Sequence, residues 1–322
     1  MKTGWWSSVV EALEWKSPAD EVIDRGRAAF DTVARLSLAT LRRRPSVLGE
    51  VVRAIPPAAD HGLIRSPLAP LLIFNAIYPE DTAAALLNGW GRPPASVADA
   101  TELSCQPHPV LELLRDDIGV EAEWLEPARA GVVMEKAKLA VSLIEATSPP
   151  CARLIRRCTH LVLFVRSPDP RVGSLSFCQF AGLSLIVNAD EERVSPADVA
   201  DRIIHESIHD LLYTGHFAEP LLAEPGGSDT ASLKITSPWT GRPLTLRNYV
   251  HACFVWYALS RFWSLPSLAF APAQAIRRRD IAVRGFQATS SVLDPLGPSA
   301  ALLSPSLLEA LDSLHGRASS IE

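Results

Sequence analysis

Two histidines and a glutamate fall within five consecutive residues, HESIH, between His205 and His209. In a helix, residues four apart project side by side, so the two imidazoles can bind one metal ion. Glu206 lies at the flank of the same site, where a carboxylate can act as a general base or orient a ligand. This HExxH pattern predicts metal-dependent chemistry. The alternative is that the histidines only fill a core or cap a helix.

The segment from Ser195 to Gly215 carries the signals of a helix that would position these three side chains. Ser195 suits an N-cap, Pro196 suits the first helical position, and Asp198 completes a capping box with the serine. Apolar residues then recur at three- and four-residue spacing, and Gly215 is a plausible end of the helix. The sequence therefore predicts that both histidines project from one helix.

A metal site needs at least a third protein ligand, and four downstream residues are candidates: His216, Glu219, Glu224 and His251. The extension typical of metzincins is missing from DLLYTGH, and a thermolysin-like site would need a glutamate on a following helix, which neither glutamate clearly provides. His251 lies on the inward stripe of a predicted apolar helix over residues 247–263. A lone histidine there is usually a core residue, but next to an incomplete histidine pair we expect a facial triad of His205, His209 and His251.

Length and composition set the class of protein. The 322 residues are enough for a large core or two domains, and 48% hydrophobic with 21% charged residues is typical of an ordinary folded chain. A net charge of −5 argues against a nucleic-acid partner. No apolar run approaches a membrane span and the N-terminus lacks a signal-peptide core, so we expect no membrane partner and a cytoplasmic location. The five cysteines lack CxxC spacing, so we expect them to be buried thiols.

The predicted secondary structure changes near the middle of the chain. Helices are predicted over 19–42, 46–55, 66–77, 80–89 and 129–147. From His160 onward, the apolar run HLVLFVR and the segment 173–188 predict short strands directly before the HExxH helix. The expected fold class is therefore α+β, predominantly helical, with a small β-sheet preceding the metal-binding helix.

We expect two regions. Residues 1–150 would be a helical N-terminal region that supports the enzyme or recognises a substrate or leader peptide, and residues 151–322 would be the metal-binding catalytic domain. Near the C-terminus, helices are predicted from 273 towards 293 and over 304–315, followed by a frayed tail in which His315 is solvated.

Three blocks in a fixed order carry a family resemblance: HESIHDLLY, then SPWTGRPL at Ser237–Leu244, then NYVHACFVWYALSRFW. Together they resemble the HEXXH-motif family of 2-oxoglutarate-dependent peptide β-hydroxylases in ribosomal-peptide (RiPP) natural-product biosynthesis. The upstream segment GSLSF also fits, and the resemblance covers about residues 160–265. The sequence departs from the pattern at Thr240 and Gly241, where a basic and an acidic residue are expected.

The resemblance implies a non-haem iron dioxygenase. Iron(II) held by His205, His209 and His251 would bind 2-oxoglutarate, activate molecular oxygen and hydroxylate an unactivated carbon. The expected target is the β-carbon of an amino-acid residue in a peptide or a carrier-bound substrate. In this setting Glu206 would orient a ligand near the iron.

The resemblance also suggests residues for the cosubstrate pocket. Arg242 matches the arginine of the family's second block and would bind the distal carboxylate of 2-oxoglutarate through its planar fork, with Arg247 as the fallback. Trp239 could wall the pocket or simply anchor its loop. Ser174 could face the site from the preceding strand or point outward.

Two other classes stay open. A zinc-dependent HExxH metallopeptidase or hydrolase would use Glu206 as the base that activates water, with Glu219 or Glu224 as the third zinc ligand. A metal-free helical protein that binds peptides would make the HExxH pattern accidental.

Overall fold

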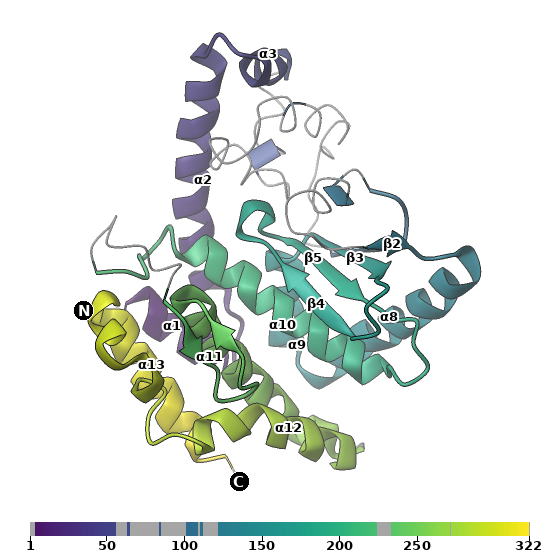
Figure 1. Ribbon diagram of the computed structural model, residues 1–322, viewed down its shortest axis with the longest axis vertical. Helices are drawn as coiled ribbons and strands as arrows, with labels where there is room; N and C mark the ends of the chain where they lie inside the picture. Colours follow the sequence, from purple (N-terminus) through teal and green to yellow (C-terminus); the bar gives the residue numbers. More distant parts are fainter. Residues whose placement is uncertain are drawn as a thin grey trace. The chain divides into compact units, whose positions relative to one another are not determined.

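The computed structural model describes residues 4–55, 63–64, 84, 101–108, 110–111, 122–223, 233–270 and 272–321. Within these ranges the chain is predominantly helical, and one small sheet precedes the HExxH helix (Figure 1). The predicted α+β class is therefore confirmed. The helices predicted over 66–77 and 80–89 fall outside the described residues, apart from Ala84.

The helices with described bounds are α1 (Trp5–Ala12), α2 (Asp20–Arg43), α3 (Val47–Ala54), α8 (Pro127–Thr147), α9 (Pro149–Cys158), α10 (Pro196–Gly215), α11 (Leu246–Trp263), α12 (Pro272–Gln287) and α13 (Pro305–Ser319). The strands are β1 (Glu102–Ser104), β2 (Glu123–Trp124), β3 (Leu161–Arg166), β4 (Gly173–Ser176), β5 (Leu183–Val187), β6 (Ile235–Thr236) and β7 (Pro243–Leu244). No helix in the described ranges has both the length and the apolar character needed to cross a membrane.

The chain forms two compact units that are interleaved in sequence. The helical unit combines Met1–Gly26, Leu143–Leu154 and Thr214–Glu322, and the sheet unit combines Arg27–Ser142 and Ile155–Tyr213. Neither unit coincides with the predicted regions 1–150 and 151–322. The functional division between a supporting and a metal-binding region stays a prediction.

The sheet unit is built on two continuous apolar runs. All five residues of β5, and all but the last of β3, are buried, as is typical of parallel strands covered on both faces. The strand order is β1-β3-β5-β4, in which β1, β3 and β5 are parallel, β4 is antiparallel to β5, and β2 pairs with β3. Residues 177–182 separate β4 from β5, and Gly182 at the end of this turn has a φ of +93°, which favours glycine.

The helical unit has α11 at its centre. The helix packs against α12 and α13, and α1 packs against α13 (Figure 1). The apolar residues of α11 are buried around most of the circumference of that helix. Trp5 and Trp6 of α1 are fully buried. The predicted apolar helix over 247–263 is confirmed.

Two expectations near the C-terminus are wrong. Helix α12 ends at Gln287 and not near residue 293, because Asp294 accepts hydrogen bonds from Ser290 and Ser291 in a turn that ends the helical path. Helix α13 runs on to Ser319, and His315 is buried on it. The apolar stripe of α13 continues to the buried Ala318, so the residues after His315 stay helical.

Candidate metal site

Helix α10 begins with the predicted capping box. The backbone N–H of Asp198 donates to Ser195 Oγ at 3.2 Å, and the N–H of Ser195 donates to Asp198 Oδ2 at 2.8 Å. Each side chain thus satisfies a backbone donor of the other residue, which fixes where the helix starts. The start in turn determines which face His205 and His209 share.

His205 and His209 lie side by side on α10. Their ring centroids are 5.1 Å apart, and both side chains are half-buried. Burial lowers the pKa of His205 well below its ordinary value, and the neighbouring His209 and the charge of Arg202 lower it further. Burial also lowers the pKa of His209, against the opposing charge of Glu206. Both imidazoles are therefore neutral at pH 7, the form that binds a metal ion.

Glu206 sits next to the pair but is covered. Its side chain is 2% exposed, and its Oε1 atom lies 3.9 Å from His205 Nε2. Two neutral imidazoles with a carboxylate at the flank suit a first-row transition metal such as iron or zinc. The same position is compatible with orienting a metal ligand or with acting as a base, so it does not by itself separate the oxygenase from the hydrolase.

A buried carboxylate that the sequence analysis overlooked fastens α10 to the sheet. Asp210 accepts hydrogen bonds from the hydroxyl of Thr159 at 2.7 Å and from the N–H of Gly182 at 2.9 Å. Thr159 lies two residues before β3, and Gly182 lies directly before β5. Burial raises the pKa of Asp210 well above its ordinary value. The spacing of Asp210 four residues after Glu206 was the available signal, because it marks a buried polar face on the helix.

Tyr213 extends the histidine face by one turn. Its ring stacks on His209 with centroids 6.0 Å apart, and its hydroxyl donates to the carbonyl oxygen of Ser176 at 3.4 Å. This residue was also missed, although its spacing of four from His209 puts it on the same face of the helix. Tyr213 therefore forms one wall beside the histidine pair.

His251 is buried, with 1% of its surface exposed, and its ring contacts the ring of His216. The two Nε2 atoms are 3.1 Å apart, and the ring of His216 also lies 5.8 Å from the indole of Trp6. Burial lowers the pKa of His216 to about 3, and the charge of Arg247 lowers it further. The structure thus brings His251 together with His216, another of the candidate ligands.

The predicted triad draws its members from both units. His205 and His209 belong to the sheet unit, whereas His251 belongs to the helical unit. Within the described part of either unit, no three His, Cys, Asp or Glu side chains are grouped so that they could hold a metal ion. The assignment of His251 as the third ligand stays a prediction.

Trp239 anchors the hairpin formed by β6 and β7. Its indole N–H donates to the carbonyl oxygen of Ala282 at 2.8 Å, and its ring stacks on Trp256 and meets Phe286 edge-on. A Cβ atom at Gly285 would overlap the indole, so this glycine is needed for the close approach. The structure shows that Trp239 anchors its loop, and its role as a wall of the cosubstrate pocket stays a prediction.

The two arginines proposed for the cosubstrate differ in their surroundings. Arg242 lies in the hairpin with an exposed side chain, and its carbonyl oxygen accepts the N–H of Ser237 at 2.9 Å. Arg247 lies in the first turn of α11, four residues before His251, and its positive charge lowers the pKa of His216. Of the two arginines, Arg247 is the one whose charge affects His216, the partner of His251, and its role in binding a cosubstrate stays a prediction.

Ser174 points inward and not toward solvent. Its Oγ atom is buried and has no hydrogen-bond partner among the described residues, and the same holds for Ser176 Oγ. A hydroxyl in this state costs free energy unless a ligand or water pairs with it. Ser174 therefore remains a candidate for ligand binding.

Of the two glutamates proposed as zinc ligands, the structure describes only Glu219. Glu219 accepts the N–H of Trp5 at 2.6 Å and the hydroxyl of Ser306, so its two oxygens hold the start of α1 and the start of α13 in place. Glu224 lies outside the described residues. A zinc site that uses Glu219 would compete with these hydrogen bonds.

No protein-family model matches this sequence, and no curated protein matches it significantly. The functional hypothesis therefore rests on the residues themselves and on the order of the three sequence blocks.

Proposed function

We propose that this protein is an iron(II)- and 2-oxoglutarate-dependent oxygenase that hydroxylates an unactivated carbon of a peptide or carrier-bound amino acid, in the cytoplasm, during natural-product biosynthesis. The observation that carries the proposal is the pair of neutral, half-buried imidazoles of His205 and His209 on one face of α10. The order of the three sequence blocks favours the oxygenase over other metal-dependent reactions.

Each residue has a role in this proposal. His205, His209 and His251 would hold the iron, which together with 2-oxoglutarate and oxygen supplies the oxidising power for attack on a C–H bond. Glu206 would orient His205, and Tyr213 would cover one side of the pair. An arginine would pair with the distal carboxylate of 2-oxoglutarate, and its planar fork suits this task.

A zinc hydrolase would use the residues of α10 in a different way. It needs Glu206 to deprotonate a water molecule, and the third zinc ligand proposed for it is a glutamate, Glu219 or Glu224. The hydrogen bonds of Glu219 to Trp5 and Ser306 count against that residue as the ligand. The hydrolase is therefore kept as the alternative outcome of the experiment.

The test is anaerobic addition of iron(II) and then 2-oxoglutarate to the full-length protein, followed by oxygen. We expect a visible metal-to-ligand charge-transfer band that is lost in His205→Ala and His251→Ala, and succinate after oxygen is admitted. If the protein instead binds zinc tightly and cleaves peptides in a Glu206-dependent manner, it is a hydrolase. If it binds no metal, the histidines are structural.

The same assay compares the two arginines proposed to bind 2-oxoglutarate. Both arginines are exposed, but Arg247 lies one turn before His251 whereas Arg242 lies in the hairpin, so Arg247→Gln should raise the KM for 2-oxoglutarate at least tenfold while iron affinity is unchanged. Arg242→Gln should change the KM less. If Arg242→Gln raised the KM more than Arg247→Gln, Arg242, the residue that matches the family block, would be the arginine that binds 2-oxoglutarate.

A further inference from the structure

Trp6 of α1 carries a buried indole N–H group that lacks a partner. Its side chain is fully buried, and its Nε1 atom forms no hydrogen bond within the described part of the chain. Three other buried indoles each donate to a backbone carbonyl oxygen at 2.8 to 3.0 Å, from Trp5 to Val22, from Trp15 to Ala258 and from Trp239 to Ala282. Because a buried donor without an acceptor costs free energy, the Trp6 group needs an acceptor from outside the chain.

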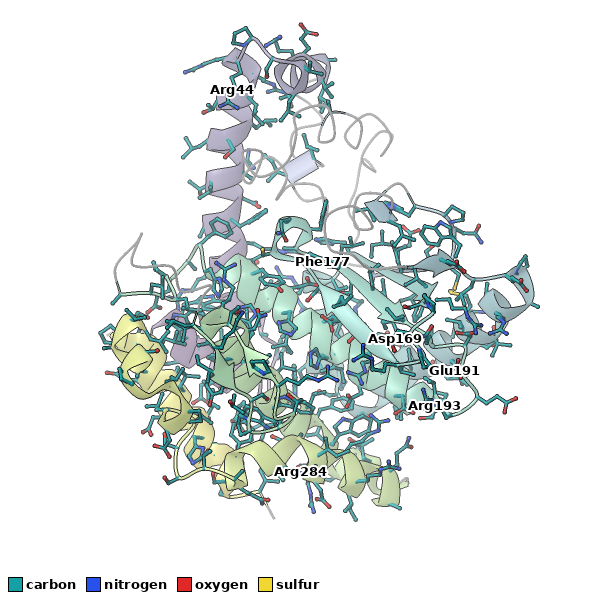
Figure 2. All side chains as sticks on the ribbon, in the orientation of Figure 1. Arg44, Asp169, Phe177, Glu191, Arg193 and Arg284 are labelled. Carbon is teal, nitrogen blue, oxygen red and sulfur yellow. The ribbon has the colours of Figure 1, made fainter. Side chains whose placement is uncertain are left out.

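Trp6 lies close to the proposed ligand His251. Its ring centroid is 5.6 Å from that of Phe254 on α11 and 5.8 Å from that of His216. His216 in turn contacts His251, with their Nε2 atoms 3.1 Å apart. Figure 2 shows how densely the side chains of this unit fill the space between α1, α11 and α13. The indole is therefore one ring away from His251, in the same unit of the chain.

Helix α11 brings a positive charge to this cluster. Arg247, His251 and Phe254 follow each other at spacings of four and three residues, so they share one face of the helix. The charge of Arg247 reaches His216, because it lowers the pKa of that imidazole. The ring that contacts Trp6 therefore lies in the positive field of Arg247.

These surroundings define the chemistry of the missing acceptor. An indole N–H can only donate, so it pairs with an acceptor such as an oxygen atom and not with a cation. Glu219, the acid at the start of α1, already accepts hydrogen bonds from Trp5 and Ser306. A donor in a positive field attracts a carboxylate more strongly than a neutral carbonyl group.

We propose that Trp6 donates its indole N–H to the carboxylate of a bound ligand, beside His216 and in the positive field of Arg247. The assignment of this carboxylate to 2-oxoglutarate rests on the proposed oxygenase function, whereas binding at the site requires no iron. A carboxylate of the peptide or amino-acid substrate has the same chemistry, and the experiment separates the two sources.

The test uses the full-length, metal-free protein, isotope-labelled at tryptophan, and follows the indole N–H signals by nuclear magnetic resonance. The signal that is missing in Trp6→Phe identifies the Trp6 group. The probes are 2-oxoglutarate and N-acetylalanine, each compared with its uncharged methyl ester. We expect 2-oxoglutarate to shift the Trp6 signal downfield in a saturable way, because a charge-assisted hydrogen bond deshields the proton.

The other outcomes of this titration are also decisive. A shift with N-acetylalanine but not with 2-oxoglutarate would support the carboxylate site and assign it to the substrate. No shift with either carboxylate, or an equal shift with the uncharged esters, would overturn the proposal.

Variants show which groups hold the carboxylate. Trp6→Phe keeps an aromatic ring against Phe254 and His216 but lacks the N–H, so its affinity for 2-oxoglutarate, measured by equilibrium dialysis, should fall at least fivefold. Arg247→Gln removes the positive charge and should weaken binding at least tenfold. The matched control Trp15→Phe removes an indole that is already paired and should leave the affinity unchanged.

Thermal unfolding separates lost binding from lost folding. Trp6→Phe removes a donor that has no partner, whereas Trp15→Phe removes an existing hydrogen bond. Trp6→Phe should therefore lower the unfolding temperature less than Trp15→Phe does. An equal loss of 2-oxoglutarate affinity in both variants would show that packing and not the N–H is responsible. If Trp6→Phe does not fold, Arg247→Gln and the shift of the wild-type signal decide the question.

The two proposals fail in different ways. A charge-transfer band and succinate formation, combined with an unchanged Trp6 signal, would keep the oxygenase and remove the carboxylate site. A shift of the Trp6 signal without a charge-transfer band would keep the carboxylate site and remove the oxygenase.

Discussion

At the scale of residues, α10 separates its polar side chains between two faces. His205 and His209 are half-buried on one face, whereas Glu206 and Asp210 are covered on the other. Asp210 is held by Thr159 and Gly182, so this half of the helix cannot rotate without losing two buried hydrogen bonds. The histidine face is therefore fixed by a carboxylate that does not itself belong to the metal site.

Glu206→Gln separates the two metal-dependent reactions. An amide keeps the size of the side chain and can still hydrogen-bond near His205, but it cannot act as a base. For an oxygenase we expect unchanged iron content and a loss of succinate formation of about tenfold, in line with residues that orient metal ligands. A loss of about 1,000-fold with intact metal binding, measured as peptide hydrolysis, would instead identify a general base.

His216 and His251 can be told apart by metal binding. His216→Phe keeps an aromatic ring against Trp6, so the packing should survive. If His251 is the third ligand, His216→Phe should retain iron, whereas His251→Phe should weaken iron affinity by more than about 100-fold, beyond the effect of losing an orienting residue. Equal losses in both variants, measured by equilibrium dialysis, would make His216 a ligand as well.

At the scale of elements, Glu14 ties three helices of the helical unit together. It follows α1 and accepts hydrogen bonds from Tyr257 and Arg261 of α11, with Arg317 of α13 at 3.5 Å. Burial alone would raise its pKa, but the hydrogen bond from Tyr257 and the charges of Arg261 and Lys16 outweigh burial and lower the pKa below 4.5. The carboxylate is therefore stabilised in its charged form by folding.

This arrangement predicts a pH-dependent contribution to stability. Because the folded pKa is lower than the unfolded pKa, the contribution is present above pH 4.5 and is lost as the pH falls through the folded value. Glu14→Gln should lower the free energy of unfolding by about 2 kcal/mol at pH 7 in urea denaturation. The gap to the wild type should narrow below pH 4.5.

The matched control is Glu11→Gln, which removes an exposed partner of Arg317 and should change the free energy of unfolding by less than about 0.5 kcal/mol. A gap between wild type and Glu14→Gln that stays constant from pH 7 to pH 3 would show that the carboxylate charge is not what stabilises the three helices.

At the scale of the whole molecule, each unit is assembled from distant segments. Strands β1 and β2 from the first half of the chain pair with β3 from the second half, and α1 packs against α13. A cut near residue 150 therefore divides both units. This interleaving differs from a simple succession of two domains along the chain.

A fragment of residues 151–322 tests the point directly. It lacks β1, β2 and α1, and so would expose one side of β3 and the packing surface of α13. We expect no cooperative unfolding transition for the fragment by circular dichroism, in contrast to the full chain. A fragment that unfolds cooperatively and binds iron would support the predicted boundary near residue 150.

The sequence by itself determined the elements and their local chemistry. The capping box at Ser195, the buried runs of β3 and β5, the apolar helix α11 and the shared face of His205 and His209 all follow from spacing within one segment. Such signals depend on backbone periodicity and on short-range hydrogen bonds, so they can be read before the chain folds.

Only the tertiary structure decided which faces meet. The pairing of His251 with His216, the insertion of Trp239 beside Gly285 and the burial of His315 each join segments far apart in sequence. A single sequence shows that a face is apolar or carries a histidine, but not which other face covers it. That choice depends on the shapes of several side chains packing together, and no local spacing encodes it.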